Sequence, residues 1–439
     1  MTPAVQARLL ASMNAGRLVV VCGAGLSMAP PSNLPSARRV AEMCFDEYRL
    51  TADPYCDEAL RTDLEALAEH FVGLNTLESV FIERIVPWTA FTRPSNPGHA
   101  AIADFLITRA FTAGLSTNYD TLIERSAWDN GFDFRGSLDG DDANIQAAKQ
   151  GPLLKFHGCA LQDRLFTVWA PSQLAEPRIA ARIEKSKTWM AANLRQRDLL
   201  VVGFWSDWTY LNAIIGSALR DVAPLSVTVV DLSDAQQLEA KAPDLWALAH
   251  SDHVTFEHVR ESGSDVLDEL RRAFSKNYLR QMLDAGRVAF EADIGRKSDP
   301  NWLEVADHGS ETLYGWRRDA EGVPAGEPAS QLHPVNCQVL GYFHLLLRSA
   351  GAQEHPEGYE LNGRTIRVLN GAGTLLSKIQ SRFVEAPPLP AADVIVAVGA
   401  IDLGVPANVV RRGQVGSVVR PAAGGAWFDT VGARTELNV

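Results

Sequence analysis

Small and polar residues that could bind a nucleotide or move a proton recur along the first half of the sequence. Gly23, Ala24, Gly25 and Ser27 form a short glycine-rich segment. Glycines let backbone amides approach a pyrophosphate closely because no Cβ stands in the way. The same segment could instead make a tight turn between a strand and a helix. It also departs from the G-x-G-x-x-G fingerprint, because Met28 stands where the third glycine would be.

Two further clusters carry hydrogen-bonding and acid–base chemistry. Asn118 is uncharged and can both donate and accept, which suits holding a ribose hydroxyl or a water. Asp120, two residues on, could bind a ligand or cap the helix that follows. His157 has an ordinary pKa near ~6.5, so its neutral ring could accept a proton at cellular pH. A hydrogen-bonded structural histidine is the alternative.

Two later clusters offer polar groups for the rest of a nucleotide. Gly203, Ser206 and Asp207 could bind a ligand or simply begin a capped helix before Trp208. Asp231 follows an apolar run, and an acidic residue at a strand end can bind an adenosine ribose. A turn residue is the alternative interpretation of Asp231.

Each cluster directly follows a short apolar run, and helical patterns lie between the runs. Strands that alternate with helices predict a doubly wound, Rossmann-like α/β domain with a parallel sheet. Ligands bind outside the carboxyl ends of such strands, so we expect the clusters to gather at one rim. The expected strands are Leu18–Cys22, Ala110–Leu115, Leu153–Phe156, Leu199–Val202 and Ser226–Val230.

The helical pattern predicts five segments and two domains. Ser36 is expected to cap one helix, and Asp57–Val72, Ile179–Leu194, Trp208–Leu219 and Val266–Ala289 are the others. The last should close a first domain of residues 1–290. Residues 291–439 read as a smaller C-terminal α+β module for oligomer or partner contact, or as a stabilising extension. Its expected elements are a helix at Val335–Ala350 and strands at Tyr359–Leu369, Asp393–Val398 and Gln414–Val419, with Pro-containing stretches at Val323–Pro334 and Ala386–Pro390.

Composition excludes several classes of protein. The 439 residues are 46% apolar and 21% charged, an ordinary globular balance. The net charge of −12 argues against nucleic acid as the main ligand. No apolar run reaches the ~18 residues that span a membrane, and the N-terminus lacks a signal-peptide pattern. Five scattered cysteines without a C-x-x-C pair exclude a four-cysteine zinc module and indicate a reduced, cytoplasmic protein.

Taken together, these residues resemble the sirtuin (silent information regulator) family. Gly23–Ser27 matches the Gly-Ala-Gly-Ile-Ser of sirtuins, and Asn118 and Asp120 match the Asn and Asp of Thr-Gln-Asn-Ile-Asp. His157-Gly158 matches the family's His-Gly pair, and Gly203–Ser206 loosely matches a Gly-Thr-Ser-like segment. The resemblance covers residues 15 to 235 and implies a sirtuin-like fold that binds NAD.

Two departures separate the sequence from protein-deacylating sirtuins. Asn33–Ala37 stands where they carry Asp-Phe-Arg, and the zinc module is absent. The sequence looks more like the sirtuin-like domains of bacterial anti-phage systems, which hydrolyse NAD to ADP-ribose and nicotinamide. This resemblance implies a regulated defence effector that acts by NAD depletion. It also implies a homo-oligomer and a partner such as a HerA-type ATPase or a short argonaute.

The resemblance also implies roles for the residues that match. His157 would be the general base, and Asn118 would position the attacking water or the ribose. Asp120 would bind the nicotinamide carboxamide. Gly23, Ala24, Gly25 and Ser27 would hold the pyrophosphate, and Gly203, Ser206 and Asp231 would serve the adenosine half. No metal is expected. The alternatives are a non-catalytic NAD or ADP-ribose sensor that controls assembly and an NAD-dependent protein deacylase.

Overall fold

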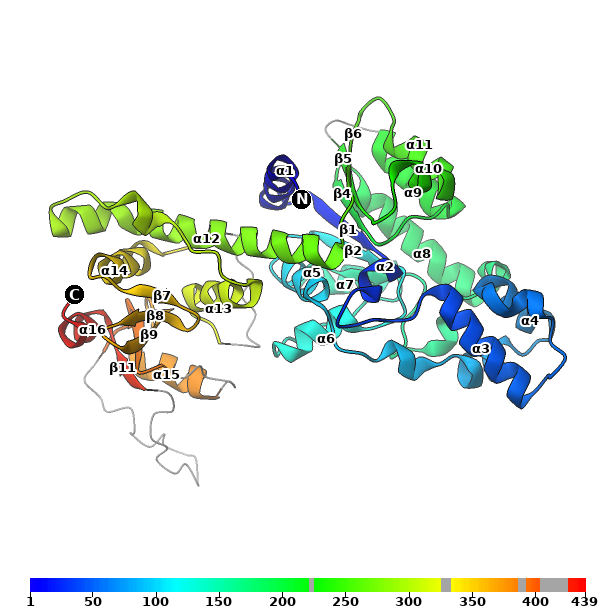
Figure 1. Cartoon of the computed structure of the whole chain (residues 1–439), viewed down its shortest axis with the longest axis horizontal. Helices are drawn as coiled ribbons and strands as arrows, with labels where there is room; N and C mark the ends of the chain where they lie inside the picture. Colours follow the sequence, from blue (N-terminus) through cyan, green and yellow to red (C-terminus); the bar gives the residue numbers. More distant parts are fainter. Residues whose placement is uncertain (221–224, 325–332, 386–391, 403–424) are drawn as a thin grey trace, which may run out of the picture. The chain divides into compact units, whose positions relative to one another are not determined.

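The computed structural model describes residues 1–220, 225–324, 333–385, 392–402 and 425–439. These residues form two compact units, the first of residues 1–129 and 133–270, the second of residues 130–132 and 271–439. The division lies inside one long helix, α12 (Gly263–Ile294) (Figure 1). The domain boundary expected after residue 290 lies further along the same helix and stays a prediction.

The first unit is built on a six-stranded parallel sheet. Its strands run in the order β3-β2-β1-β4-β5-β6, and every neighbouring pair is parallel. This order is that of doubly wound dinucleotide-binding sheets, so the predicted fold class is confirmed. The strands are β1 (Leu18–Cys22), β2 (Ala113–Ser116), β3 (Leu153–Lys155), β4 (Asp198–Val202), β5 (Leu225–Val230) and β6 (Val254–Val259).

The start of one expected strand differs by three residues, those of β4 and β5 differ by one, and one strand was missed. The strand expected from Ala110 begins at Ala113, because Phe111 still hydrogen-bonds back to the preceding helix through Phe105 O at 2.9 Å. β6 lies at the sheet edge, and most of its residues are only partly buried. It therefore lacks the continuous apolar run that identifies a central parallel strand.

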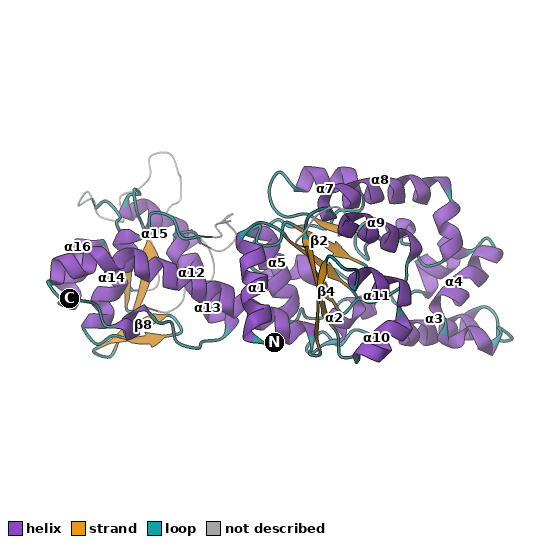
Figure 2. Cartoon of the chain, turned by 90° about the horizontal axis from the view of Figure 1, so that it is seen from above, coloured by secondary structure: helices purple, strands orange, loops and turns teal. Residues whose placement is uncertain are grey.

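Helices cover both faces of this sheet. In Figure 2, α1 (Pro3–Asn14) and α5 (Pro97–Ile107) lie on one side of the strands, and α8, α9 and α11 lie on the other. The apolar side chains of the second group form one core with β1, β4 and β5. Their bounds are α8 (Pro177–Leu194), α9 (Thr209–Arg220) and α11 (Pro243–Ala249); the shorter helices are α2 (Ala24–Met28), α6 (Leu122–Asp129), α7 (Gly140–Gln146) and α10 (Ala235–Lys241).

A helical insertion separates β1 from β2. It contains α3 (Ala37–Thr51), which Ser36 caps as expected through a bond to Arg39 N, and α4 (Leu64–Gly73). The single helix expected over Asp57–Val72 is wrong. Asp63 is extended and its side chain accepts from Ala66 N, so it caps α4 and interrupts the pattern after a 3₁₀ turn.

The second unit packs helices against a mixed sheet. Its strands run in the order β11-β10-β9-β8-β7, parallel from β9 to β11 and antiparallel from β7 to β9. The predicted α+β architecture is confirmed. The elements are α13 (Ser310–Glu321), α14 (Gln338–Ser349), α15 (Leu376–Glu385), α16 (Thr430–Leu437), β7 (Gln353–His355), β8 (Gly358–Leu361), β9 (Arg364–Asn370), β10 (Val394–Val398) and β11 (Ala426–Phe428).

One expected strand of this unit is a hairpin instead. Tyr359–Leu369 is predicted as a strand in a region punctuated by Asn-Gly and Gly-Gly signals, and one such pair, Asn362 and Gly363, turns the chain with φ of 54° and 75°. Two consecutive positive φ angles at Asn-Gly are typical of the tight turn that joins β-hairpins. The strand expected at Gln414–Val419, the stretch Ala386–Pro390 and most of Val323–Pro334 lie outside the described residues.

Glycines set the close crossing of α12 and α14. A Cβ on Gly341 would lie 2.9 Å from Gly286 N and would clash with Met282 O. We therefore expect Gly341→Ala to lower the free energy of unfolding by about 1–3 kcal/mol, as overpacking does. A Cβ on Gly315, in α13, would have no atom within 4 Å among the described residues. Gly315→Ala is the matched control and should stabilise by about 0.5–1 kcal/mol.

Urea unfolding of the two glycine variants and the wild type tests this crossing. Equal midpoints for Gly341→Ala and wild type would contradict the close packing of α12 on α14.

Among the described helices, none is long and apolar enough to cross a membrane.

Candidate functional site

A large pocket opens at the carboxyl ends of β1, β2, β3 and β4. Its volume is about 690 Å³. It lies where the strand order reverses between β1 and β4, which is the usual ligand position in a doubly wound sheet. Its far wall comes from the helical insertion and from the segment Val168–Leu174.

The pocket brings together most of the residues selected from the sequence. The predicted site residues that line it are Ala24, Ser27, Asn118, Asp120, His157, Gly203 and Ser206. Gly23, Gly25 and Asp231 are not among the residues that line it. The expectation that the strand ends converge on one rim is therefore confirmed for the loops after β1, β2, β3 and β4, but not for Asp231 after β5.

Ser27 is the centre of a buried hydrogen-bond network. Its hydroxyl donates to Asp120 Oδ2 at 2.9 Å and accepts from Asn118 Nδ2 at 3.1 Å. His99 Nε2 lies 3.1 Å from the same oxygen. Ser27 and His99 are each only 1% exposed. The network therefore fixes the side chains of Asn118 and Asp120 from behind.

The tautomer of His99 follows from its second contact. His99 Nδ1 accepts from Asn96 N at 3.1 Å, so the ring proton must be on Nε2, which donates to Ser27. Burial lowers the pKa of His99 to about 4, and this agrees with a neutral ring. Sequence reasoning missed His99, although Asn96-Pro97 marks the start of α5. The side chains of Asn96 and His99 form a capping box there.

The network leaves the side-chain oxygen of Asn118 available to a ligand. Asn118 Nδ2 is held by Ser27, whereas Oδ1 has no hydrogen-bond partner in the described part of the chain, and the residue is 9% exposed. Asp120 Oδ1 accepts from Leu122 N, the first residue of α6, at 3.1 Å, so Asp120 forms a turn just before the helix and lies one position ahead of the N-cap that the alternative expected. The Ser27 hydroxyl is fully engaged, so its predicted contact with a pyrophosphate would require this network to rearrange.

His157 lines the pocket and is surrounded by aromatic rings. Its ring centroid lies 4.0 Å from that of Trp208 and 6.3 Å from that of Tyr119. Burial, reinforced by the charge of Arg182, lowers the pKa of His157 to about 3, while a hydrogen bond to the Thr117 backbone opposes this shift. The imidazole is therefore neutral at pH 7 and can accept a proton.

Arg182, in α8, supports the strand end that carries His157. It is 6% exposed, and its guanidinium donates to Phe156 O at 2.9 Å and to Leu138 O at 3.1 Å. Phe156 directly precedes His157, so Arg182 holds the backbone at the carboxyl end of β3. Sequence reasoning missed Arg182, because it lies inside an ordinary amphipathic helix and no local motif marks it.

The glycines after β1 and β4 pack against each other. Gly25 N donates to Gly203 O at 3.0 Å, and a Cβ on Gly25 would lie 2.8 Å from Gly203 Cα. A Cβ on Gly23 would lie 2.8 Å from Phe204 Cβ. This close approach accounts for Gly23 and Gly25 without a ligand. Their predicted contact with a pyrophosphate stays a prediction.

The two acidic residues of the later clusters are engaged with the backbone. Asp207 accepts from Asp244 N and Leu245 N at 3.1 and 2.9 Å, so it caps the start of α11 instead of α9. Asp231 Oδ1 accepts from Ser233 N at 2.8 Å, as a turn residue would. The predicted contact of Asp231 with an adenosine ribose stays a prediction.

Aromatic side chains form a wall of the pocket that sequence reasoning did not identify. Tyr119 stacks on Trp169 with ring centroids 4.2 Å apart, and its hydroxyl donates to Val168 O at 2.6 Å. Phe91 and Trp208 line the same pocket. Flat apolar surfaces of this kind suit an aromatic ring. The wall combines residues far apart in the sequence, so no local motif announces it.

The buried histidines predict a loss of stability in mild acid. In the unfolded chain, His99 and His157 take up protons near pH ~6.5, whereas in the folded chain their pKa values are about 4 and about 3. Acidification below pH 6.5 therefore stabilises the unfolded state, and the full stability is present only above that pH. We expect the urea midpoint to fall between about pH 7 and pH 5, and a constant midpoint would contradict the neutral, buried rings.

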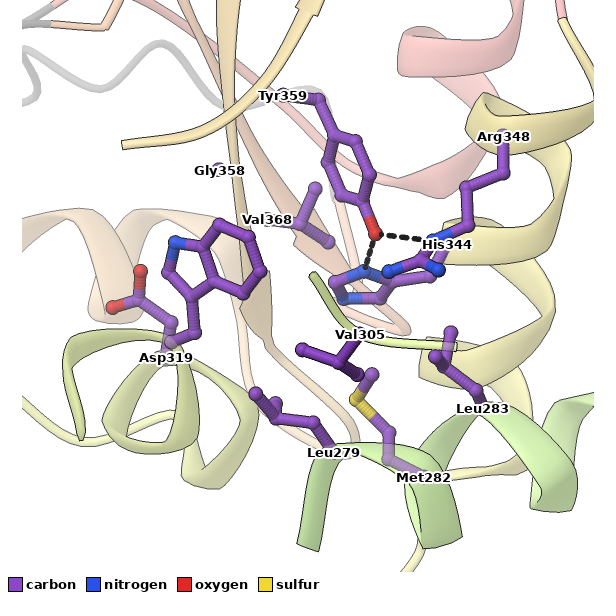
Figure 3. Close-up of a pocket in the computed structure, with 11 residues that line it drawn as sticks. Leu279, Met282, Leu283, Val305, Asp319, His344, Arg348, Gly358, Tyr359 and Val368 are labelled. Atoms are coloured by element: carbon purple, nitrogen blue, oxygen red, sulfur yellow. Dashed lines mark hydrogen bonds between the residues drawn. The ribbon is translucent and has the colours of Figure 1, made fainter. Parts of the chain in front are cut away.

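A second, much smaller cavity lies in the second unit (Figure 3). Its volume of about 20 Å³ has room for a single water. Tyr359 lies at its side, with its hydroxyl 2.8 Å from His344 Nδ1 and accepting from Arg348 Nε at 3.0 Å. This cavity is too small for a nucleotide.

In the part of the chain that the structure describes, no group of three His, Cys, Asp or Glu side chains could hold a metal ion.

A comparison with protein families identifies part of this first unit. Residues 112–254 match the SIR2-like domain. The match covers about a third of the chain, from just before β2 into β6, and includes Asn118, Asp120 and His157. The resemblance predicted from the sequence is confirmed to this extent. The glycine-rich segment Gly23–Ser27 lies outside the SIR2-like match.

Among solved structures, the crystal structure of a Sir2 homologue–NAD complex is similar at 15% identity and a TM-score of 0.35, over 60% of this chain and 91% of that chain. Another, described as the structural basis for the mechanism and regulation of Sir2 enzymes, is 15% identical with a TM-score of 0.32, over 62% of this chain and 96% of that chain. At these scores the fold assignment depends on the strand order of the sheet itself. A search among curated proteins finds no match.

Proposed function

We propose that this protein binds NAD in the pocket at the carboxyl ends of β1–β4 and hydrolyses it to ADP-ribose and nicotinamide. The observation that carries the proposal is the meeting of His157 and Asn118 in one pocket, with the Asn118 side-chain oxygen facing no protein partner in the described chain. The SIR2-like match over the segment with both residues supports it.

The bond to be cleaved joins nicotinamide to C1′ of ribose. The nicotinamide ring is a cationic pyridinium in NAD and becomes neutral when it leaves, so no general acid is required. The developing positive charge on the ribose and the attacking water are what the site must stabilise. The carboxylate of Asp120, 7% exposed at the pocket wall, offers a fixed negative charge for the ribose or an acceptor for the nicotinamide carboxamide.

His157 and Asn118 divide the work on the nucleophile. Asn118 Oδ1 accepts from the water or from a ribose hydroxyl and fixes its direction, because Ser27 holds the other end of the amide. Neutral His157 accepts a proton from the attacking water, either directly or through a ribose hydroxyl. The stacked rings of Tyr119 and Trp169 line the same pocket beside these two residues.

Two alternative functions remain distinct from this proposal. A sensor that only binds NAD or ADP-ribose needs neither a neutral base nor an oriented amide in the pocket. An NAD-dependent deacylase would need an acyl-lysine peptide to take the ADP-ribosyl group. The apolar side of the pocket, which Leu34, Leu64 and Leu174 help to line, is the feature that favours keeping the deacylase as a second candidate.

The wider context stays a prediction of the sequence resemblance. It comprises NAD depletion in anti-phage defence, a cytoplasmic location, a homo-oligomer and a HerA-type ATPase or short argonaute partner. We propose that the second unit serves oligomer or partner contact.

The experiment that tests the function measures NAD consumption and nicotinamide release by the full-length protein. It is run with and without an acyl-lysine peptide, and with and without cell extract. Hydrolysis predicts nicotinamide release that does not depend on the peptide. Release only with the peptide would favour the deacylase. NAD that binds but stays intact under every condition would favour the sensor and exclude the hydrolase.

A further inference from the structure

The strongest unexplained feature near the pocket is a buried ion pair. Lys155, at the end of β3, and Glu124, in α6, are each 1% exposed, and Lys155 Nζ lies 3.1 Å from Glu124 Oε1. Removing two charges from water is costly, and a pair of apolar residues would often be at least as stable in the same place. The pair therefore calls for an explanation other than stability.

The contacts of Lys155 connect the two chain segments that carry Asn118 and His157. Its ammonium donates to the backbone oxygen of Asp120, in the loop after β2. It also lies 3.6 Å from Cys159 Sγ, two residues beyond His157. A second link joins the same segments, because Ala160 N donates to Tyr119 O at 2.8 Å.

The surroundings are shaped to hold the pair. A Cβ on Gly136 would lie 2.8 Å from Glu124 Oε1 and would clash with the Lys155 side chain, so the absent side chain at Gly136 makes room. Burial disfavours the charged form of Lys155, but Glu124, Cys159 and Asp120 together raise its pKa above the ordinary value. The ammonium is therefore a fixed cation behind the pocket wall.

We propose that Lys155, held by Glu124, is a positioning residue that fixes the Asn118–Asp120 loop relative to the turn bearing His157. This inference rests on the proposed function for its catalytic consequence. Lys155 and Glu124 are absent from the residues that line the pocket, so they act through Asp120 and the turn after β3 and do not touch the substrate. Small displacements of reacting groups are expensive, since a shift of about 1 Å can cost about 10²-fold in rate.

Single substitutions would leave one buried charge without its partner and could unfold the chain. The test therefore uses the double variant Lys155→Met/Glu124→Gln, which removes both charges while keeping similar volume. We expect it to fold, to retain a KM for NAD within about threefold of wild type, and to lose about 10²-fold in kcat. A kcat within threefold of wild type would overturn the proposal, because a merely structural pair would affect only stability.

The matched control removes another well-buried ion pair. Arg367 and Asp319 form two hydrogen bonds in the second unit, at 2.8 and 2.6 Å, and both side chains are 11% exposed. Arg367→Met/Asp319→Asn should lower the thermal midpoint but leave kcat per folded molecule unchanged. Equal losses of kcat in the two double variants would also overturn the proposal.

A second readout does not depend on NAD turnover. We expect the amide of Ala160, which bonds to Tyr119 O, to exchange its hydrogen at least about tenfold faster in Lys155→Met/Glu124→Gln. The amide of Val201, in β4, should be unchanged. If wild type releases no nicotinamide, the proposed function fails and the exchange rates alone decide the positioning claim. Unchanged exchange at Ala160 would overturn it whatever the activity.

Discussion

Replacement of His157 by alanine is expected to reduce the kcat of nicotinamide release by ~10²–10⁴-fold, the usual contribution of a general base. The ring is neutral because burial and Arg182 lower its pKa to about 3. The wild-type enzyme should consequently keep its kcat/KM as the pH falls through 6.5, since the base stays unprotonated. A histidine with an ordinary pKa would lose activity in that range.

The matched control is His344→Ala in the second unit. His344 is also a neutral histidine whose pKa burial lowers to about 3, and it bonds to Tyr359. Its loss should leave nicotinamide release per folded molecule at the wild-type rate. Far-ultraviolet circular dichroism of both variants confirms folding. Activity of His157→Ala within tenfold of wild type would remove His157 from the mechanism.

Replacement of Asn118 by alanine is expected to lower kcat by about 10²-fold, with a smaller change in KM. The variant loses the oxygen that faces the pocket and the amide that Ser27 holds at 3.1 Å. The water or ribose hydroxyl then has no fixed direction. Steady-state nicotinamide release separates kcat from KM, and calorimetry with NAD measures binding independently.

Asn193→Ala is the control for this change. Asn193 is a partly buried asparagine in α8 whose Nδ2 donates to Trp189 O, and it lies outside the pocket. Its kcat should equal that of wild type. An Asn118→Ala enzyme that loses NAD binding but keeps kcat at saturation would show that Asn118 only binds substrate, and our assignment would be wrong.

The strand-end clusters made the site predictable in outline. Parallel strands place their carboxyl ends at one edge, so Ser27, Asn118 and His157 had to approach one another once the apolar runs were recognised as strands. The same reasoning located both ends of β1 and placed β5 to within one residue. These elements are buried on both faces, and their continuous apolar runs are a strong signal.

What the sequence concealed depends on contacts between distant residues. His99 lies 72 positions from Ser27, and Lys155 lies 31 positions from Glu124. Neither pair forms a local motif, and each residue alone is ordinary in its own element. The break at Asp63 was missed because the apolar spacing continues across it, while the capping bond to Ala66 N decides where α4 begins.

The most direct test of the central claim is a progress curve for NAD incubated with the full-length protein, without acyl peptide and with cell extract added in a parallel sample. The account predicts that nicotinamide and ADP-ribose accumulate in equal amounts as NAD disappears in at least one of the two samples. NAD that binds the protein but remains intact in both would contradict it.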